Sequence, residues 1–332
     1  MTKASMMQAM VLEGVDAPFR RATVDRPKPA AGQVLVRVAA SGVNPLDLKI
    51  RHGQAPHAKH PLPAVLGLDL AGTVESVGAA VTAFKPGDVV YGLAGGVGGL
   101  QGSLAEFMAV DADLLAVKPK ALDMREAAVL PLVFITAWEG LVDRARVRAG
   151  QKVLVHGAGG VGHMAIQIAR AFGAEAYAVD SAARRLEIQA ENAVAIDYRR
   201  STVDQYVDEH TGGEGFDLVY DTVGGQSLDA SFHAVRRFGH VVSCLGWGNH
   251  ALAPLSFRAA TYSGVFTLLP MLTGRGRAHH GEILRDAAKL ADAGKIRPRL
   301  DPRRFGLSSV LDAYGAIEDR SAKGKVVVDV AE

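Results

Sequence analysis

Apolar residues in the first 125 positions come in short runs, and turn-forming residues separate one run from the next. Short runs bounded by Gly, Pro, Asn or Asp are typical of β-strands. The Lys85–Asp88 segment (Lys-Pro-Gly-Asp) and the glycine-rich Gly95–Gly99 segment are two such boundaries. Since no long amphipathic helix interrupts the runs, this region predicts a barrel-like β module. Its expected strands are Gln8–Leu12, Gln33–Ala40, Ala71–Val77, Val89–Tyr91 and Leu104–Val110.

From residue 151 onward, apolar runs alternate with segments of helical periodicity. This alternation predicts an α/β fold with a parallel, doubly wound sheet and right-handed crossovers. The expected strands are Val153–Val155, Ala176–Val179, Ala193–Ile196, Phe216–Tyr220, His240–Leu245 and Gly264–Leu269, and the expected helices are His163–Phe172, Ala182–Glu191, Thr202–His210 and Gln226–Val235, with an irregular connection over Trp247–Ser263.

Two further segments set the expected domain boundaries. Asp123–Leu141 is almost continuously apolar and helical in pattern, with Pro131 kinking or dividing it. After about residue 270 a mixed pattern returns, and this tail is too short to form a domain. We therefore predict a β module formed by residues 1–127 and 271–332, with residues 128–270 inserted as the α/β domain. The elements expected in the tail are the helices Ile283–Ala293 and Ser308–Ile317 and the strand Lys325–Val330.

The stretch Lys152–Gly173 carries the most specific motif of the chain. It contains G-x-G-x-x-G as Gly157-Ala158-Gly159-Gly160-Val161-Gly162, directly after an expected strand and at the start of an expected helix. The first glycine permits a tight turn, the second lets backbone approach a pyrophosphate, and the third lets the helix pack close to the strand. Asp180 follows Gly162 by 18 residues, at the end of the next strand, where a ribose hydroxyl would be bound. The motif predicts a dinucleotide site.

Composition restricts the remaining possibilities. The chain has 332 residues and a formal net charge of +2, so it offers no general basic field for nucleic acid or membrane. No run of 18 or more apolar residues occurs, and the N-terminal segment lacks the apolar core of a signal peptide, which leads us to expect a cytoplasmic protein. The single cysteine, Cys244, excludes an intramolecular disulfide and any zinc site that needs two or more thiolates.

Taken together, these features resemble the medium-chain dehydrogenase/reductase superfamily, in which a GroES-like β-rich catalytic domain is combined with a Rossmann cofactor domain. The segment Ser41–Asp47 (Ser-Gly-Val-Asn-Pro-Leu-Asp) resembles the S-G-V-N-P-x-D stretch of zinc-independent quinone oxidoreductases, the zeta-crystallin-like branch. The segment Leu66–Gly72 resembles the stretch in which alcohol dehydrogenases of the superfamily carry G-H-E. The resemblance covers essentially the whole chain.

A catalytic zinc in this superfamily needs a Cys in the first stretch, a His in the second, and a further Cys or Asp before the cofactor domain. Asn44, Leu68 and Leu132 occupy these positions here, and Asn is a poor zinc ligand while Leu is none. We therefore predict no metal. Without zinc, alcohol oxidation lacks its Lewis acid, whereas a quinone or an α,β-unsaturated carbonyl is already electrophilic. The resemblance implies the same reaction, reduction of quinones or enones by NAD(P)H.

The candidate catalytic residues are Asn44, Asp47 and Tyr91. By resemblance, Asn44 and Asp47 lie in a loop beside the nicotinamide, where Asn44 would orient the cofactor or hold a substrate carbonyl and Asp47 would order a water or fix the loop. The alternative for both is ordinary turn chemistry. Tyr91 is a candidate proton donor or stacking wall, and its alternative is a core tyrosine.

The candidate cofactor-binding residues comprise the glycine loop and positions that the resemblance supplies. Thr136 matches the family's threonine that contacts nicotinamide. Segments at the carboxyl ends of two later strands line the adenine and nicotinamide sides. The full set is Thr136, Gly157, Ala158, Gly159, Gly160, Val161, Gly162, Asp180, Arg184, Arg185, Tyr198, Thr222, Val223, Leu245 and Gly246.

The choice between NAD(H) and NADP(H) depends on opposing charges. Asp180 would accept hydrogen bonds from both ribose hydroxyls and repel a 2′-phosphate, which favours NAD(H). Arg184 and Arg185 would favour NADP(H) if Asp180 turned aside to pair with Arg184. Tyr198, followed by two arginines, resembles the branch's residues at the adenosine end. Because of the Asp180 carboxylate, we expect the cofactor to be NAD(H).

The sequence is also compatible with two other functions. One is a metal-free alcohol or carbonyl dehydrogenase of the same superfamily, and the other is a non-catalytic NAD(P)-binding protein with a crystallin-like or RNA-binding role. The partners expected are a small-molecule quinone or enone and, by resemblance, a second copy of the chain in a homodimer.

Overall fold

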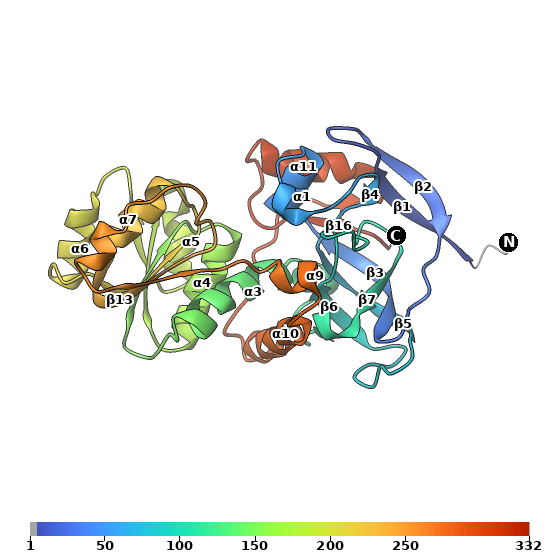
Figure 1. Ribbon diagram of the computed structural model, residues 1–332, viewed down its shortest axis with the longest axis horizontal. Coiled ribbons are helices and arrows are strands. Elements are labelled where there is room, and N and C mark those ends of the chain that lie inside the picture. Colours follow the sequence, from blue (N-terminus) through green and yellow to red (C-terminus); the bar gives the residue numbers. More distant parts are fainter. Residues whose placement is uncertain (1–4, 332) are drawn as a thin grey trace. The chain divides into compact units, whose positions relative to one another are not determined.

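Contacts among residues divide the chain into two compact units. The computed structural model describes residues 5–331 (Figure 1). The first unit runs up to Leu132 and resumes at Leu268, and the second is the continuous stretch Val133–Thr267. The boundaries expected from the sequence, at 127 and 271, lie a few residues from these divisions.

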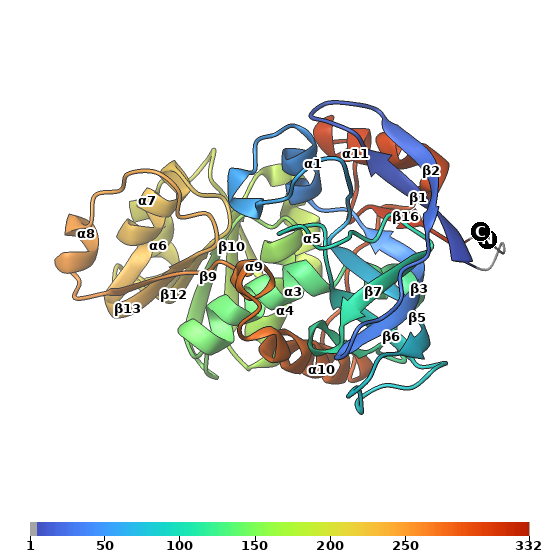
Figure 2. The ribbon, with the colours of Figure 1, turned by 45° about the vertical axis from the view of Figure 1, so that its right-hand side comes forward.

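The first unit is built on strands that pair mostly antiparallel. One sheet has the order β2-β1-β4, and a second has the order β15-β16-β3-β5-β6-β8, with β7 also paired to β3. Figure 2 shows β3, β5, β6 and β7 side by side. The strands are β1 (Met6–Leu12), β2 (Phe19–Asp25), β3 (Gln33–Gly42), β4 (Ala64–Val65), β5 (Asp69–Val77), β6 (Val89–Leu93), β7 (Phe107–Asp111), β8 (Leu115–Val117), β15 (Phe305–Gly306) and β16 (Val327–Asp329), and the helices are α1 (Pro45–Arg51), α2 (Met124–Ala128), α9 (Leu269–Thr273), α10 (Arg277–Asp292) and α11 (Val310–Glu318).

Strand β3 is the centre of the larger sheet. It pairs along its length with β5, and it also pairs with β7 and with β16 near the end of the chain. At its last residue, Gly42, a Cβ atom would lie 2.2 Å from the carbonyl oxygen of Ala128, so only glycine lets α2 pack this close. The GroES-like β-rich domain predicted from the sequence is confirmed.

The second unit is a six-stranded parallel sheet with the order β11-β10-β9-β12-β13-β14. The strand order reverses between β9 and β12, and ligands of doubly wound folds bind outside the carboxyl ends of the strands at such a point. The predicted Rossmann fold is confirmed. Its strands are β9 (Lys152–His156), β10 (Glu175–Asp180), β11 (Val194–Asp197), β12 (Phe216–Asp221), β13 (Val235–Ser243) and β14 (Thr261–Gly264), and its helices are α3 (Pro131–Trp138, begun in the first unit), α4 (Gly160–Ala171), α5 (Arg185–Ala190), α6 (Val203–Thr211), α7 (Gln226–Ala234) and α8 (Ala253–Ser256), with a π-helical turn at Glu139–Arg144.

Both faces of this sheet are covered by helices. Leu154 of β9 lies in a core cluster with Tyr206 of α6 and Phe232 of α7. The next residue, Val155, points to the opposite face, because successive side chains of a strand alternate. There it lies against α4, since a Cβ at Gly162 would be 3.4 Å from Val155 Cγ1. Helices α6 and α7 therefore cover one face and α4 the other.

Two edge strands depart from the sequence expectations. The expected strand Gly264–Leu269 is wrong: the edge strand β14 is Thr261–Gly264, and the apolar run after it leads into α9, which has Pro270 in its first turn. Strand β2 was not expected at all. Both β2 and β14 are half-exposed and pair on one side only, so they need no continuous apolar run to form.

No helix within residues 5–331 is long and apolar enough to span a bilayer.

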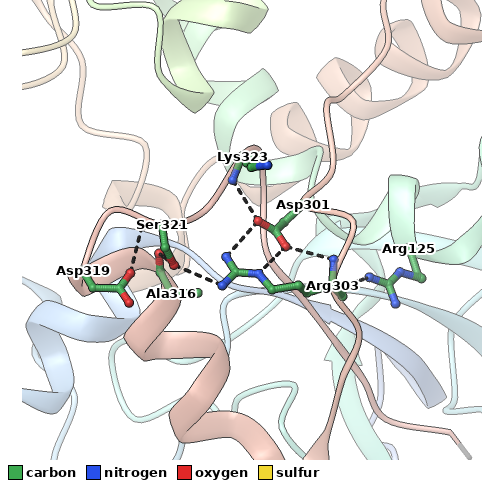
Figure 3. A network of polar contacts seen from close by, with 7 residues as sticks. All are labelled: Arg125, Asp301, Arg303, Ala316, Asp319, Ser321 and Lys323. Carbon is green, nitrogen blue, oxygen red and sulfur yellow. Dashed lines mark hydrogen bonds and ion pairs between the residues drawn. The ribbon is translucent and has the colours of Figure 1, made fainter. Parts of the chain in front are cut away.

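A polar network fixes the returning C-terminal segment of the first unit (Figure 3). The Asp301 side chain is only 1% exposed, and its two oxygens accept bonds from the Arg303 guanidinium at 2.8 and 2.9 Å. Lys323 N donates to the same carboxylate at 2.8 Å. Arg125 joins β16 to this segment, because it contacts Asp329 at 2.6 Å and the Arg303 carbonyl at 2.9 Å. The Arg303 guanidinium lowers the pKa of Asp301 to about 2.

Replacing Asp301 by Asn should lower the free energy of unfolding by about 2 kcal/mol, because the Arg303 guanidinium and the backbone N–H groups of Arg303 and Lys323 lose a charged acceptor. The folded pKa of Asp301 is lowered, so its contribution is present above the unfolded pKa of about 3.9 and is lost as the pH falls through about 2. Urea unfolding at pH 7 and at pH 3 measures both effects. The control is Asp286→Asn, whose pair with Lys289 is exposed and should contribute less than about 0.5 kcal/mol. Equal losses in the two variants would contradict this assignment.

Candidate cofactor site and a buried polar cluster

The glycine-rich turn lies at the carboxyl end of β9 and leads into α4. Gly157 has φ +84°, a conformation that disfavours other residues. A Cβ on Gly162 would lie 1.7 Å from the Gly157 carbonyl oxygen, so the turn closes only without a side chain there. Around Gly159 the space that a Cβ would occupy is open. Because α4 begins at Gly160, its free N–H groups face the end of the sheet where an anion can bind.

Asp180, at the end of β10, is tied to this turn. Its Oδ2 accepts a hydrogen bond from Ala158 N at 2.7 Å, and its Oδ1 accepts one from Ser181 N at 2.6 Å. The Arg184 guanidinium bonds Glu187 at 3.0 Å and lies 3.9 Å from Asp180. The Asp180 carboxylate is therefore oriented by the glycine loop, and Arg184 is shared between two carboxylates.

A second set of bonds joins the ends of β12 and β13 to β9. Asp221 has no exposed surface, and it accepts bonds from Gly224 N at 3.1 Å and from Ser243 Oγ at 2.7 Å. Thr222 Oγ1 donates to the His156 carbonyl at 2.7 Å. The next residue, Val223, is 55% exposed. Hydrogen bonds thus hold the turn after β12, and the turn presents an apolar side chain at the edge of the sheet where doubly wound folds bind their ligands.

The remaining predicted cofactor residues lie at separate places in the second unit. Thr136, on α3, is almost buried, and its hydroxyl lies 3.1 Å from that of Thr267. Tyr198 is 54% exposed and follows β11, and Arg185 is the first residue of α5. Two further predicted residues, Leu245 and Gly246, follow β13 after one intervening residue, Cys244.

A buried polar cluster lies in the first unit at the predicted catalytic loop. Asn44, Asp47 and Asp69 are each at most 1% exposed. Asn44 Nδ2 donates to Asp69 Oδ2 at 2.9 Å, and Leu132 N donates to Asp69 Oδ1 at 3.0 Å. Asp47 accepts bonds from the backbone of Asn44 at 2.8 Å and of Gly67 at 3.2 Å.

The cation of the cluster is Lys325, which precedes β16. Its ammonium donates to Asn44 Oδ1 and, at 3.1 Å, to the Val43 carbonyl. Burial raises the pKa of Asp47 to about 8 and that of Asp69 to about 7, and it lowers the pKa of Lys325. The Lys325 ammonium and the Asn44 amide oppose the effect of burial on the pKa of Asp69, so Asp69 is the carboxyl group of the cluster that ionises first and carries the charge opposite the ammonium.

This geometry changes the roles expected for the catalytic candidates. Both ends of the Asn44 amide are bound by charged groups and the residue has no exposed surface, so Asn44 and Asp47 form the framework of the loop. Tyr91 is a core residue: it is fully buried and its hydroxyl donates to the Leu284 carbonyl at 2.6 Å. Burial raises the pKa of Tyr91 as well. The predicted role of Tyr91 as proton donor has no support in this position.

Two residues of the cluster, Asp69 and Lys325, were not anticipated from the sequence. A signal was present for Asp69, because a carboxylate inside the apolar run Leu66–Ala71 must be buried and therefore needs partners. Lys325 carries no comparable local signal, since a lysine at the start of a strand is ordinarily solvated.

Among residues 5–331, no group of three or more His, Cys, Asp or Glu side chains is arranged to hold a metal ion. His52, the residue that follows α1, has its two ring nitrogens against Asp16 and Glu318.

Comparison with known proteins supplies the family. Residues 30–120 match the alcohol dehydrogenase GroES-like domain, and residues 189–328 match the zinc-binding dehydrogenase family. An NADPH-dependent alkenal/one oxidoreductase of Arabidopsis thaliana is 36% identical over 95% of this chain and 76% of its own length. A 2-methylene-furan-3-one reductase of Solanum lycopersicum is 37% identical over 89% of this chain and 71% of its own.

Among solved structures, an alcohol dehydrogenase superfamily protein from Novosphingobium aromaticivorans is 58% identical and superimposes with a TM-score of 0.96, covering 98% of this chain and 100% of its own. The chain belongs to the medium-chain dehydrogenase/reductase superfamily. It is an oxidoreductase, and the predicted family and enzyme class are confirmed.

The glycines of the loop should differ in what their substitution affects. Gly162→Ala should lower the free energy of unfolding by about 1–3 kcal/mol without any ligand, because its methyl group collides with the Gly157 carbonyl. Gly159→Ala should leave unfolding unchanged and weaken NADH binding, since its methyl group enters the space through which backbone approaches a pyrophosphate. Urea unfolding and NADH fluorescence titration measure the two effects. NADH affinity equal to wild type in Gly159→Ala would contradict the assignment of the loop.

Proposed function

We propose that the protein reduces the C=C bond of an α,β-unsaturated carbonyl, or a quinone, with a nicotinamide cofactor and without zinc. The observation that carries the proposal is that one chain has both a dinucleotide-type glycine turn, in its second unit, and a fully buried Asn44 whose amide oxygen contacts the Lys325 ammonium, in its first. The two curated relatives act, by their names, on an alkenal/one and a methylene-furanone, which are conjugated carbonyl compounds.

The residues of the second unit fit the cofactor. The open space at Gly159, the N-terminus of α4 and the exposed Val223 offer a pyrophosphate cradle and an apolar surface at one edge of the sheet. When bound, the reduced nicotinamide supplies the hydride. For an enone, the β-carbon gains the hydride, the α-carbon gains a proton, and the saturated carbonyl compound and the oxidised nucleotide are the products.

The residues at the zinc-ligand positions do not fit a metal. Leu68 and Leu132 have no donor atom in their side chains, and Asn44 Oδ1 faces the ammonium of Lys325, whose charge opposes a divalent cation. A conjugated acceptor suits such a site, because it is electrophilic before it is bound.

A panel of substrates tests the proposal. We expect oxidation of NADH or NADPH by enones and quinones, with the saturated ketone or aldehyde identified by mass spectrometry, and unchanged rates after treatment with 1,10-phenanthroline. Alcohol oxidation with NAD⁺ that no enone or quinone reduction accompanies would favour the metal-free dehydrogenase. Nucleotide binding without turnover of any substrate would favour a non-catalytic protein.

For the cofactor, we propose that the enzyme prefers NADH, although the Arabidopsis relative is named for NADPH. The Asp180 carboxylate faces the glycine loop through its bond to Ala158 N, so a 2′-phosphate bound there would meet a negative charge. Arg184, a candidate to neutralise that phosphate, donates a hydrogen bond to Glu187 at 3.0 Å and lies 3.9 Å from Asp180, so its charge is already shared between two carboxylates.

Replacing Asp180 by Asn keeps an acceptor for Ala158 N and removes the charge. The ratio of kcat/KM for NADPH over NADH should rise about tenfold or more, because one repulsive charge beside the phosphate is lost. Steady-state kinetics with both cofactors measures it. Asp208→Asn removes an exposed carboxylate from α6 and should leave the ratio unchanged. An unaltered ratio in Asp180→Asn would show that the carboxylate does not set the preference.

A further inference from the structure

By resemblance to the zinc-containing members of the superfamily, three separate segments of the first unit supply the positions at which those enzymes have metal ligands. They are the loop that contains Asn44, the residue before β5 (Leu68), and Leu132, with which the first stretch of the unit ends. A bound metal cross-links the segments that ligate it, and a fold that does without the metal has to hold them by other contacts.

The Asp69 carboxylate makes those contacts. One oxygen accepts the Asn44 side-chain amide at 2.9 Å, and the other accepts the backbone N–H of Leu132 at 3.0 Å. Its own main-chain carbonyl accepts Ser103 Oγ at 2.8 Å. The fully buried Asp69 side chain therefore joins all three segments. It bonds Asn44 and Leu132 directly, and Leu68 is its neighbour in the chain.

Lys325 supplies the positive charge. Its ammonium binds Asn44 Oδ1 and the Val43 carbonyl, and its backbone is fixed from both sides, by a bond to Arg299 O at 2.8 Å and from Asp301 N at 2.9 Å. The Asn44 amide consequently has its oxygen toward a cation and its NH₂ toward an anion. A flipped amide would set donor against donor and acceptor against acceptor, so the ammonium also fixes the orientation of Asn44.

We propose that Asp69 and Lys325 are positioning residues that replace a metal ion: the carboxylate cross-links the three segments, and the ammonium provides the compensating internal cation. This inference rests on the proposed function only for its effect on turnover. The cross-link itself is a property of the first unit. Other titratable groups near the cluster are Asp47 and Arg51 of α1 and Tyr314 of α11.

A double-mutant cycle on unfolding tests the cross-link without reference to activity. Asp69→Asn and Lys325→Met should each lower the Tm by roughly 10 °C, because each removes one of the two opposite charges that bind the buried Asn44 amide. The double variant should lose clearly less than the sum, since its members share one network. Lys323→Met is the matched control, an exposed lysine two positions earlier, and should leave the Tm unchanged. Additive losses would overturn the proposal.

Measurements on the wild-type protein and on a conservative variant keep the test independent of variants that fail to fold. Elemental analysis of the purified protein should find no stoichiometric zinc, and EDTA should leave the Tm unchanged. Lys325→Arg retains the cation and should stay closer to wild type than Lys325→Met. Stoichiometric zinc, a Tm lowered by EDTA, or an Arg variant as damaged as the Met variant would each overturn the proposal.

Enzyme kinetics of the two variants tests whether Asp69 and Lys325 also affect the proposed reaction. In folded Asp69→Asn and Lys325→Met, kcat for enone reduction by NADH should fall about tenfold or more while KM for NADH changes little, because the nucleotide site lies in the second unit. If the wild-type protein reduces no enone or quinone, the proposed function fails while the unfolding cycle still decides the cross-link. If the cycle shows coupling but kcat is unchanged, the two residues stabilise the fold and do not position the reaction.

Discussion

The first unit contains charged groups that are buried away from water, and its stability depends on other groups that replace the lost hydration. A carboxylate such as Asp69, with no exposed surface, is tolerated only if hydrogen bonds and an opposite charge replace its hydration. Asn44 and Leu132 donate hydrogen bonds to Asp69, and the ammonium of Lys325 contacts the other end of the Asn44 amide. Because Asp69 and these three partners come from four separate stretches of chain, the loop, the sheet and the C-terminal return must form together for any of them to be stable.

The second unit uses a carboxylate differently. Asp180 accepts a bond from Ala158 within the glycine loop, so the residue expected to read the ribose also orients the turn that holds the pyrophosphate. Recognition of the nucleotide and the shape of its cradle are therefore physically coupled. A change of charge at this position acts on both unless the substituted side chain can still accept the Ala158 N–H bond.

Features with local causes could be predicted from the sequence. The glycine loop, its strand and its helix follow from neighbouring residues, and Gly157 and Gly162 have the backbone and packing roles expected of them. Edge strands such as β2 and β14 escaped prediction because exposed strands need no apolar pattern. The cluster of Asp69 and Lys325 escaped it because the two residues are far apart in sequence, and only folding brings their charges to one amide. Tyr91 belongs to the same class, since its hydroxyl bonds a carbonyl of α10 that no local pattern indicates.

The hydroxyls of Thr136 and Thr267 lie 3.1 Å apart, near the two points where the chain enters and leaves the second unit. Domains whose ends meet in this way can be gained, lost or exchanged as units, because closing the gap left in the host chain requires only a short connection. The two ends of the α/β unit therefore lie close together, so the unit is attached to the rest of the chain at a single place. Sequence changes within it, including those that alter nucleotide choice, can accumulate without disturbing the order of strands in the β module that surrounds it in the sequence.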